Sequence, residues 1–346
     1  MGINSISGSS FVNTSRGEVS IQPSQDQRER GSIDSFVREQ QGQVSPEQNF
    51  ANAGKAYQNM HAQNMANVQG TMGIQGEAVN MYPNRAGYDE NFLGTKLPLP
   101  TLGDSIKDQV AMRTDKPGEY ELPYTNFSIV MNGERKQCFY TICNIDGSQS
   151  QNIKRSGEWE IDGRIPRDCQ LGNEAYRNND IDKGHMVRRL DPCWGKNAKR
   201  ANNDTFSYCN ATLQHGGLNQ KEWLELENHV IDTATGEGSK MTVITGPIFR
   251  EDDPWFDNNG KMKEPAQIPM SFFKTVVWAG DDGNLKSASF VLSQEDIING
   301  DGQLHLKEFT PGRFDVYQVP QKQLEEMTDL HFGNIGDITE QPKRLT

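Results

Sequence analysis

The sequence predicts an α+β protein, with a central and mostly antiparallel sheet that follows a largely disordered N-terminal arm. From about residue 88 onward, short runs rich in β-branched and aromatic residues end at Gly, Pro, Asn or Asp, which is typical of strands and turns. Helical periods are few and do not alternate with these runs, so the βαβ pattern of a parallel sheet is missing. The first 85 residues are rich in Gln, Asn, Ser and Gly. Such a composition buries too little apolar surface to offset chain entropy.

This change of composition divides the chain into an arm over residues 1–85 and a folded domain over residues 86–340. Four large apolar residues of the arm would share one face of a helix over residues 46–67: Phe50, Tyr57, Met60 and Met65. The stripe has two interpretations, docking to a partner or a transient helix in a mostly disordered segment. The polar composition of the arm favours the second.

The strands of the domain follow in order along the chain. An extended lead-in over residues 88–100 comes first. A hairpin is expected next, with strands over residues 127–131 and 137–143 and the two-residue turn signal Asn132-Gly133. Three later strands are expected over residues 241–245, 271–278 and 287–292.

Two helices are expected. The clearer one begins near Asn219, and its apolar stripe falls at positions i, i+3, i+7 and i+8: Trp223, Leu226, Val230 and Ile231. A second, short helix is expected after Pro320.

The charge of the chain excludes one class of function and leaves another open. A formal net charge of -12 argues against a protein that coats DNA through a general basic surface. A local cluster of basic residues is nevertheless present: Arg188, Arg189, Lys196, Lys199 and Arg200. It is either a positive cleft for a polyanion or an ordinary solvated face.

The five cysteines are scattered and form no CxxC pair, so neither a thiolate zinc site nor a full disulfide framework is expected. Buried free thiols are the favoured interpretation. No apolar run is long enough to predict a membrane span, and the N-terminus lacks the basic start and apolar core of a secretory signal.

The most informative pattern is Asp182-Lys183-Gly184-His185, with Asn219 and Glu227 further along the chain. Hydrolysis of a phosphodiester requires that water lose a proton and that charge on the phosphate and the leaving oxygen be neutralised. A histidine suits the first task. A hard divalent cation suits the second, with an Asn oxygen as ligand and a carboxylate that orients the metal-bound waters.

The expected helix supports this interpretation, because Glu227 lies about 80° round the helix from Asn219. Both side chains can therefore face one cleft. Taken alone, Asn219 is better explained as a helix cap and Glu227 as a surface charge. Their spacing relative to His185 is what favours a site.

Several blocks in the same order resemble the DNA/RNA non-specific endonucleases, the sugar-nonspecific nucleases related to endonuclease G. The segment Asp182-Lys183-Gly184-His185 resembles the DRGH signature of that family. Further blocks are similar over residues 205–210, 214–220, 223–230, 245–249 and 268–274. The likeness covers about residues 88–332, including the segment 144–147 and the lead-in.

The resemblance implies a ββα-metal (His-Me finger) fold and a role for each matching residue. His185 matches the general base and Asn219 the ligand of a single Mg²⁺, for which Mn²⁺ is a substitute. Glu227 matches the carboxylate that holds the waters of the metal. Asn210 matches a polar partner near the base.

The arginine that binds the scissile phosphate is matched by Arg155, although Lys154 and Arg164 lie nearby in the sequence. The chain departs from the family at Lys183, where arginine is usual. Lysine keeps the charge but loses the fork that grips phosphate at two points. His215 stands where the family has Pro, and we interpret it as a loop residue.

The expected function is therefore a Mg²⁺-dependent endonuclease that hydrolyses DNA and RNA without sequence preference. The alternative is a catalytically weakened relative that binds nucleic acid or a partner protein, which Lys183 and the acidic balance motivate. The arm without a signal peptide suggests a secreted or translocated bacterial effector with a cognate inhibitor, or immunity, protein. The arm fits equally a tether to a partner, and the alternative location is the cytoplasm. No membrane association is expected, and the sequence carries no signal for oligomeric state.

Overall fold

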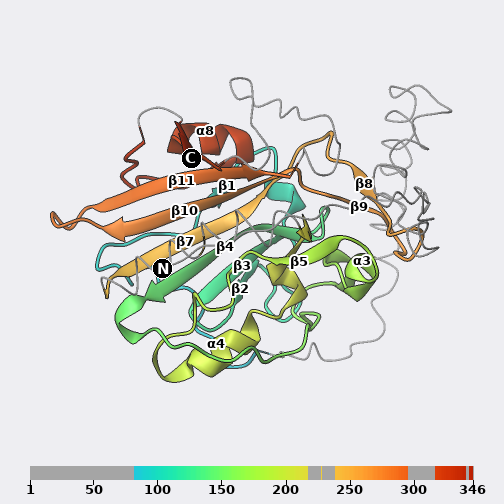
Figure 1. Ribbon diagram of the computed structural model, residues 1–346, viewed down its shortest axis with the longest axis horizontal. Helices are drawn as coiled ribbons and strands as arrows, with labels where there is room; N and C mark the ends of the chain where they lie inside the picture. The colour runs from blue at the N-terminus through green and yellow to red at the C-terminus, as the bar shows by residue number, and fades with distance from the viewer. Residues whose placement is uncertain (1–81, 217–226, 228–237, 295–315, 340–342, 346) are drawn as a thin grey trace, which may run out of the picture. The chain divides into compact units, whose positions relative to one another are not determined.

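The structure is a computed structural model that describes residues 82–216, 227, 238–294, 316–339 and 343–345 (Figure 1). The apolar stripe expected in the arm lies outside the described residues, and so does Asn219, the expected metal ligand. Of the helix expected from Asn219, only Glu227 is described, and it is helical.

A central eight-stranded sheet has the order β14-β12-β11-β10-β7-β4-β3-β2, with every neighbouring pair antiparallel. Its strands are β2 (Glu121–Pro123), β3 (Phe127–Asn132), β4 (Gln137–Asp146), β7 (Lys240–Ile248), β10 (Ser271–Ala279), β11 (Leu285–Ser293), β12 (Val316–Val319) and β14 (Lys343–Leu345). The α+β class and the expected strands are confirmed.

The β3–β4 hairpin forms where it was expected, but its turn differs from the two-residue turn that Asn132-Gly133 suggested. Residues 133–136 connect the strands, and the left-handed backbone conformation falls on Lys136, with φ of 59°. The Asn132 side chain accepts hydrogen bonds from the backbone N–H groups of Glu134 and Arg135, at 3.0 and 2.9 Å. This local bonding stabilises the longer turn.

Three two-stranded sheets accompany the central sheet: β1 (Thr101–Leu102) with β13 (Leu330–His331), β5 (Ile181–His185) with β6 (Ala211–His215), and β8 (Trp255–Phe256) with β9 (Ala266–Gln267). The α-helices bounded by the described residues are α3 (Asn173–Tyr176), α4 (Ala198–Asp204) and α8 (Gln321–Thr328). Short 3-10 turns lie at Lys107–Gln109, Gly147–Gln149, Arg167–Cys169, Gly195–Asn197 and Tyr208–Asn210. The helix expected after Pro320 is α8, which buries Leu324.

Both faces of the central sheet are covered, because β3 and β4 are buried at every residue. Phe127 and Ile129 of β3 belong to a core that includes Met186 and Val187, just after β5. Val130 of the same strand faces a second core. That core contains apolar residues of the lead-in, β13 and α8: Leu97, Leu324, Leu330 and Phe332. One face therefore carries β5 and the segment after it, and the other carries the lead-in and α8 (Figure 1).

The five cysteines are free thiols, and all except the partly exposed Cys169 are buried. None of the helices described here is long and apolar enough to cross a membrane.

Two residues on the arm side of the expected boundary at residue 85 pack against the domain. The ring of Tyr82 is 6% exposed, with its centroid 4.8 Å from that of Tyr124. The guanidinium of Arg164 lies 4.6 Å from the centre of the Tyr82 ring. Arg85 pairs with Asp204 of α4 at 2.9 Å. The packed structure of the domain therefore includes residues 82–85.

Replacing Tyr82 with alanine is expected to lower the free energy of unfolding by about 3 kcal/mol, because a buried ring is removed and a cavity remains. Tyr82→Phe keeps the ring and loses only the hydrogen bond between the hydroxyl and Ser207, so a loss of about 1 kcal/mol is expected. Urea unfolding of both variants is the measurement. Equal stability of Tyr82→Ala and the wild type would show that residues 82–85 do not belong to the folded unit.

Candidate active site

His185 ends β5, which pairs with β6 in the register Gly184↔Thr212 and His185↔Ala211. A Cβ at Gly184 would collide with the buried side chain of Gln214, so this position requires glycine. Side chains two residues apart in a strand share a face. The chain therefore presents Lys183 and His185 on the same side of β5.

The imidazole of His185 lies among aromatic rings. Its centroid is 4.8 Å from that of Trp159 and 5.4 Å from that of Phe206, which meets it edge to face. The pKa of His185 is lowered to about 3, first by burial and then by the nearby charges of Arg155 and Arg189, while a hydrogen bond to the Lys183 backbone opposes the shift. The imidazole is therefore neutral at physiological pH. Within the described part of the chain, its Nε2 has no hydrogen-bond partner.

This environment predicts an unusual titration of His185. Its ring proton signals should not shift between about pH 5 and pH 8, where an ordinary histidine titrates. Since Arg155 is one cause of the low pKa, Arg155→Ala should raise it. The free energy of unfolding should fall as pH is lowered from 6.5 towards 3. In this range His185 binds a proton in the unfolded chain but stays neutral in the folded protein. NMR titration of the substrate-free protein tests this, and a midpoint near 6.5 would contradict it.

Asn210 lies beside the motif and holds the backbone that follows His185. Its Oδ1 accepts a hydrogen bond from the Val187 N–H at 2.8 Å, and its Nδ2 donates to the carbonyl oxygens of Val187 and Thr205, both at 3.0 Å. Its backbone carbonyl accepts from the Met186 N–H at 3.0 Å. Through these bonds, the fully buried side chain fixes the path of the chain after β5.

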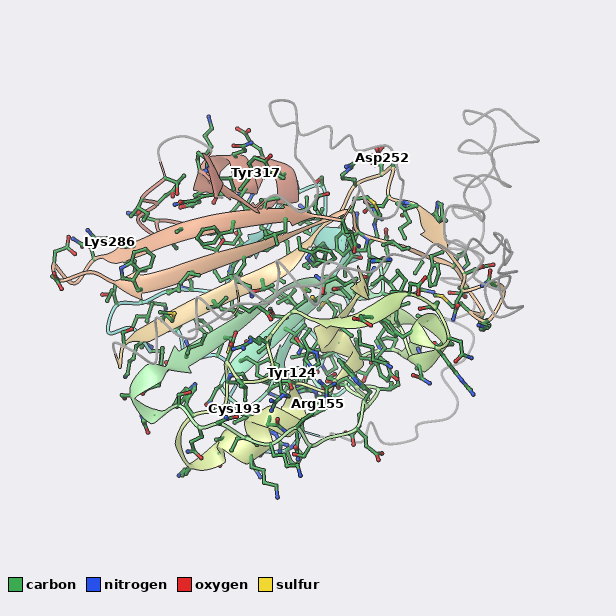
Figure 2. All side chains as sticks on the ribbon, in the orientation of Figure 1. Tyr124, Arg155, Cys193, Asp252, Lys286 and Tyr317 are labelled. Atoms are coloured by element: carbon green, nitrogen blue, oxygen red, sulfur yellow. The ribbon has the colours of Figure 1, made fainter. Side chains whose placement is uncertain are left out.

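The structure separates the three candidates for a phosphate-binding cation. Arg164 is 1% exposed, pairs with Asp162 at 2.6 Å and lies between the rings of Tyr82 and Tyr124, so it has no access to substrate. Lys154 and Arg155 are both exposed. The guanidinium of Arg155, which is labelled in Figure 2, lies 5.1 Å from the centre of the Phe206 ring, and its charge lowers the pKa of His185. Arg155 is therefore the candidate that the geometry brings to His185.

Lys183 lies in a cage of rings. Its Nζ is 5.3 Å from the centre of the Tyr176 ring and 5.8 Å from those of Trp159 and Tyr208. The same ammonium donates a hydrogen bond to the Asn173 side chain at 3.1 Å. Burial lowers the pKa of Lys183, and the charge of Asp182 opposes the shift.

Glu227 is buried, which excludes the interpretation as an exposed surface charge. Its carboxylate lies 3.8 Å from Nε of Arg188 and 3.7 Å from Nζ of Lys274. Lys274 is 1% exposed in the middle of β10 and donates a hydrogen bond to Thr245 at 3.0 Å. Asp191 completes the group at 3.9 Å from Arg188, and burial raises its pKa to about 6. Two cations and two carboxylates thus form one buried network.

In the basic cluster expected after the motif, two arginines form hydrogen bonds within the protein and the lysines are exposed. Arg189 donates to the Ile153 carbonyl at 2.6 Å and to Asn202 at 2.9 Å, and Arg200 donates to Thr125 at 3.0 Å. Lys196 and Lys199 are exposed.

A family model described as DNA/RNA non-specific endonuclease matches residues 110–336. The chain belongs to the DNA/RNA non-specific endonuclease family. The resemblance identified from the sequence is confirmed, and the ββα-metal class of fold is the one that membership of this family implies. All the candidate site residues lie inside the matched segment: Arg155, Lys183, His185, Asn210, Asn219 and Glu227.

Two curated proteins are similar to parts of this endonuclease-family chain. The uncharacterized protein y4fB of Sinorhizobium fredii is 36% identical over 231 residues, which cover 63% of this chain and 34% of that protein. A salivary endonuclease of Lutzomyia longipalpis is 28% identical over 141 residues, or 40% of this chain and 31% of that protein. The chain thus spans about a third of the length of these relatives.

Among solved structures, one described as the EndoG/EndoGI complex, on the mechanism of EndoG inhibition, is also similar. It has a TM-score of 0.47 and 18% sequence identity, and the likeness covers 62% of this chain and 85% of that one.

The endonuclease family is one of metal-dependent nucleases, so a divalent ion is expected to bind near the motif. An Asn oxygen and a carboxylate are the hard ligands that Mg²⁺ accepts while keeping several waters. Glu227 supplies a buried carboxylate, held by two cations, which suits a residue that orients waters. The described residues contain no group of three His, Cys, Asp or Glu side chains that could hold an ion by themselves. Among the described residues, the buried carboxylate of Glu227 therefore fits a divalent ion that keeps several of its waters.

Sequence reasoning missed several residues around this site. Lys274 carries a signal that could have identified it, because a lysine in an apolar strand run must find a buried counter-charge. Asp191 and Asn173 carry no comparable signal in the sequence.

Proposed function

We propose that this chain is a Mg²⁺-dependent endonuclease that hydrolyses phosphodiester bonds of DNA and RNA without sequence preference. The observation that supports it most is the neutral imidazole of His185, with Nε2 unpartnered among the described residues and a cationic side chain, Arg155, close by. A neutral imidazole can accept a proton from water, and a guanidinium can bind the phosphate that the water attacks.

Each residue has a defined task in this proposal. His185 takes the proton of the attacking water at Nε2, and the rings of Trp159 and Phe206 keep other water away from the imidazole. Arg155 binds the scissile phosphate and Asn210 fixes the backbone after His185. Asn219 and Glu227 would hold a divalent ion and its waters, and when bound the ion neutralises charge on the phosphate and the leaving oxygen. The resemblance implies a product with a 5′ phosphate.

Incubation of a supercoiled plasmid and of a long RNA with the full chain tests the proposal. Both substrates should be degraded in excess Mg²⁺, Mn²⁺ should substitute, and EDTA should stop the reaction because the charge on the leaving oxygen is then not neutralised. Intact plasmid and RNA in excess Mg²⁺ would refute the proposal. Retention of nucleic acid without turnover would instead support the catalytically weakened alternative.

We further propose that the protein acts as a secreted or translocated effector with a cognate inhibitor. The support is chemical: an enzyme that cuts DNA and RNA without preference damages the cell that makes it unless it is exported or blocked. Expression in the cytoplasm of a host without the inhibitor should arrest growth, and His185→Ala should not. Normal growth with active wild-type protein would contradict this role.

A further inference from the structure

Lys183 occupies the position where the family usually has an arginine that contacts phosphate, yet its ammonium is already surrounded. Three aromatic rings, those of Trp159, Tyr176 and Tyr208, have their centres 5.3–5.8 Å from Nζ. A cation within about 6 Å of a ring face is attracted by the ring quadrupole, and more strongly where water is partly excluded. The side chain of Lys183 is partly buried, so this condition is met.

The ammonium is also held from a fourth direction. Asn173, at the start of α3, accepts a hydrogen bond from Nζ at 3.1 Å. Arg155 differs, because it is exposed and has a ring contact with Phe206 alone among the described aromatic residues. Of these two cations, Arg155 is the one whose surroundings leave it accessible to a phosphate.

One ring of the cage also contacts the proposed base. The Trp159 centroid lies 4.8 Å from that of His185, on the face of β5 that both His185 and Lys183 share. Trp159 is supported by Phe206 at 5.5 Å and Tyr208 at 5.6 Å. The Lys183 ammonium lies near both Trp159 and Tyr208, so it connects the rings that set the position of Trp159 to β5.

We propose that Lys183 is a positioning residue, which holds Trp159 against His185 and so fixes the imidazole, and that it does not bind the scissile phosphate. The proposal deepens the proposed function and rests on it for the role of His185. Lysine fits this role because its ammonium is compact and can be enclosed by rings, whereas the planar fork of arginine is suited to phosphate.

Lys183→Met tests the proposal, since methionine keeps most of the length of the side chain and removes its charge. In the substrate-free protein, the Trp159 indole N–H and the His185 ring signals should shift in NMR spectra. Lys322→Met, on the exposed side of α8, is the matched control and should leave both signals unchanged. Unshifted signals in folded Lys183→Met would overturn the proposal.

Kinetics separate positioning from phosphate binding. For Lys183→Met, kcat should fall roughly tenfold to a hundredfold, because a small misplacement of a reacting group is costly, while KM and its salt dependence stay unchanged. Arg155→Ala should behave differently, with a raised KM and a salt slope reduced by about one. A raised KM and a reduced salt slope in Lys183→Met, as expected for Arg155→Ala, would overturn the proposal.

Two further measurements cover a variant that does not fold and a wild type that does not cleave. If thermal denaturation shows that Lys183→Met is not folded, Asn173→Ala is used in its place. That variant removes one hydrogen bond of the Lys183 ammonium, so the same NMR signals should shift by less. If the wild type does not cleave nucleic acid, the proposed function fails. The NMR comparison on substrate-free protein still decides whether Lys183 positions Trp159.

Discussion

Replacing His185 with alanine is expected to lower kcat on plasmid DNA by about 10²–10⁴-fold, the usual contribution of a positioned general base. No other imidazole can take over, because the described neighbours of His185 are aromatic rings and cations. The fold should persist, since the strand pairing between β5 and β6 runs through the backbone. Initial rates at saturating Mg²⁺ and the thermal midpoint are the two measurements.

A matched control is His331→Ala, which removes an exposed histidine on β13, on the far side of the central sheet from β5. Its rate should equal that of the wild type. His185→Ala with more than about a tenth of the wild-type rate would remove His185 from the role of base, because that loss is smaller than a general base contributes.

Replacing Asp162 with alanine is expected to lower the free energy of unfolding by about 3–5 kcal/mol, the cost of leaving a buried charge without its partner. The Asp162 carboxylate is fully buried and pairs with Arg164, which donates from Nη2 at 2.6 Å and from Nε at 3.0 Å. It also accepts a hydrogen bond from the Tyr124 hydroxyl at 2.5 Å. Without Asp162, the Arg164 guanidinium keeps its charge among aromatic rings and loses its counter-ion.

Asp168→Ala provides the comparison, because it makes the same chemical change at an exposed position and should alter stability by less than about 0.5 kcal/mol. Urea unfolding at neutral pH measures both variants. The Asp162 variant should lose activity as well. Glu160, two residues before Asp162, exchanges backbone hydrogen bonds with Phe206 and Tyr208, and these bonds position the neighbouring Trp159. A stability equal to that of Asp168→Ala would contradict the importance of this buried pair.

The sequence predicts the long strands of the central sheet, β3, β4, β7, β10 and β11, because most of their residues are buried. The short strands β2, β12 and β14 were not predicted. A strand such as β4, buried at every residue, must be apolar or internally bonded along its length, and that leaves a clear trace in the sequence. The strand β5 leaves no such trace. Its residues are mostly polar, and its conformation depends on pairing with β6 and on the packing of Gln214 against Gly184. These are tertiary contacts that a local pattern does not contain.

In the candidate site, too, some residues were predicted from the sequence and some contacts were not. Motif resemblance identified His185 and Glu227, because their residue types and spacing are visible in the sequence. The burial of Arg164 was not predicted, since it depends on a pairing with Asp162 inside a ring cluster. The cage around Lys183 was not predicted either, because Asn173, Trp159 and the two tyrosines come from separate segments that only the folded chain brings together.

The order of strands in the central sheet determines when the protein can be assembled during synthesis. β4 pairs with β7, and β7 pairs with β10, so the middle of the sheet stays open until residues 271–279 have left the ribosome. Lys274, which faces Glu227, lies on β10. Pairings between strands so distant in sequence form slowly. The contact between Glu227 and Lys274 can therefore form only after β10 has been synthesised and has paired with β7.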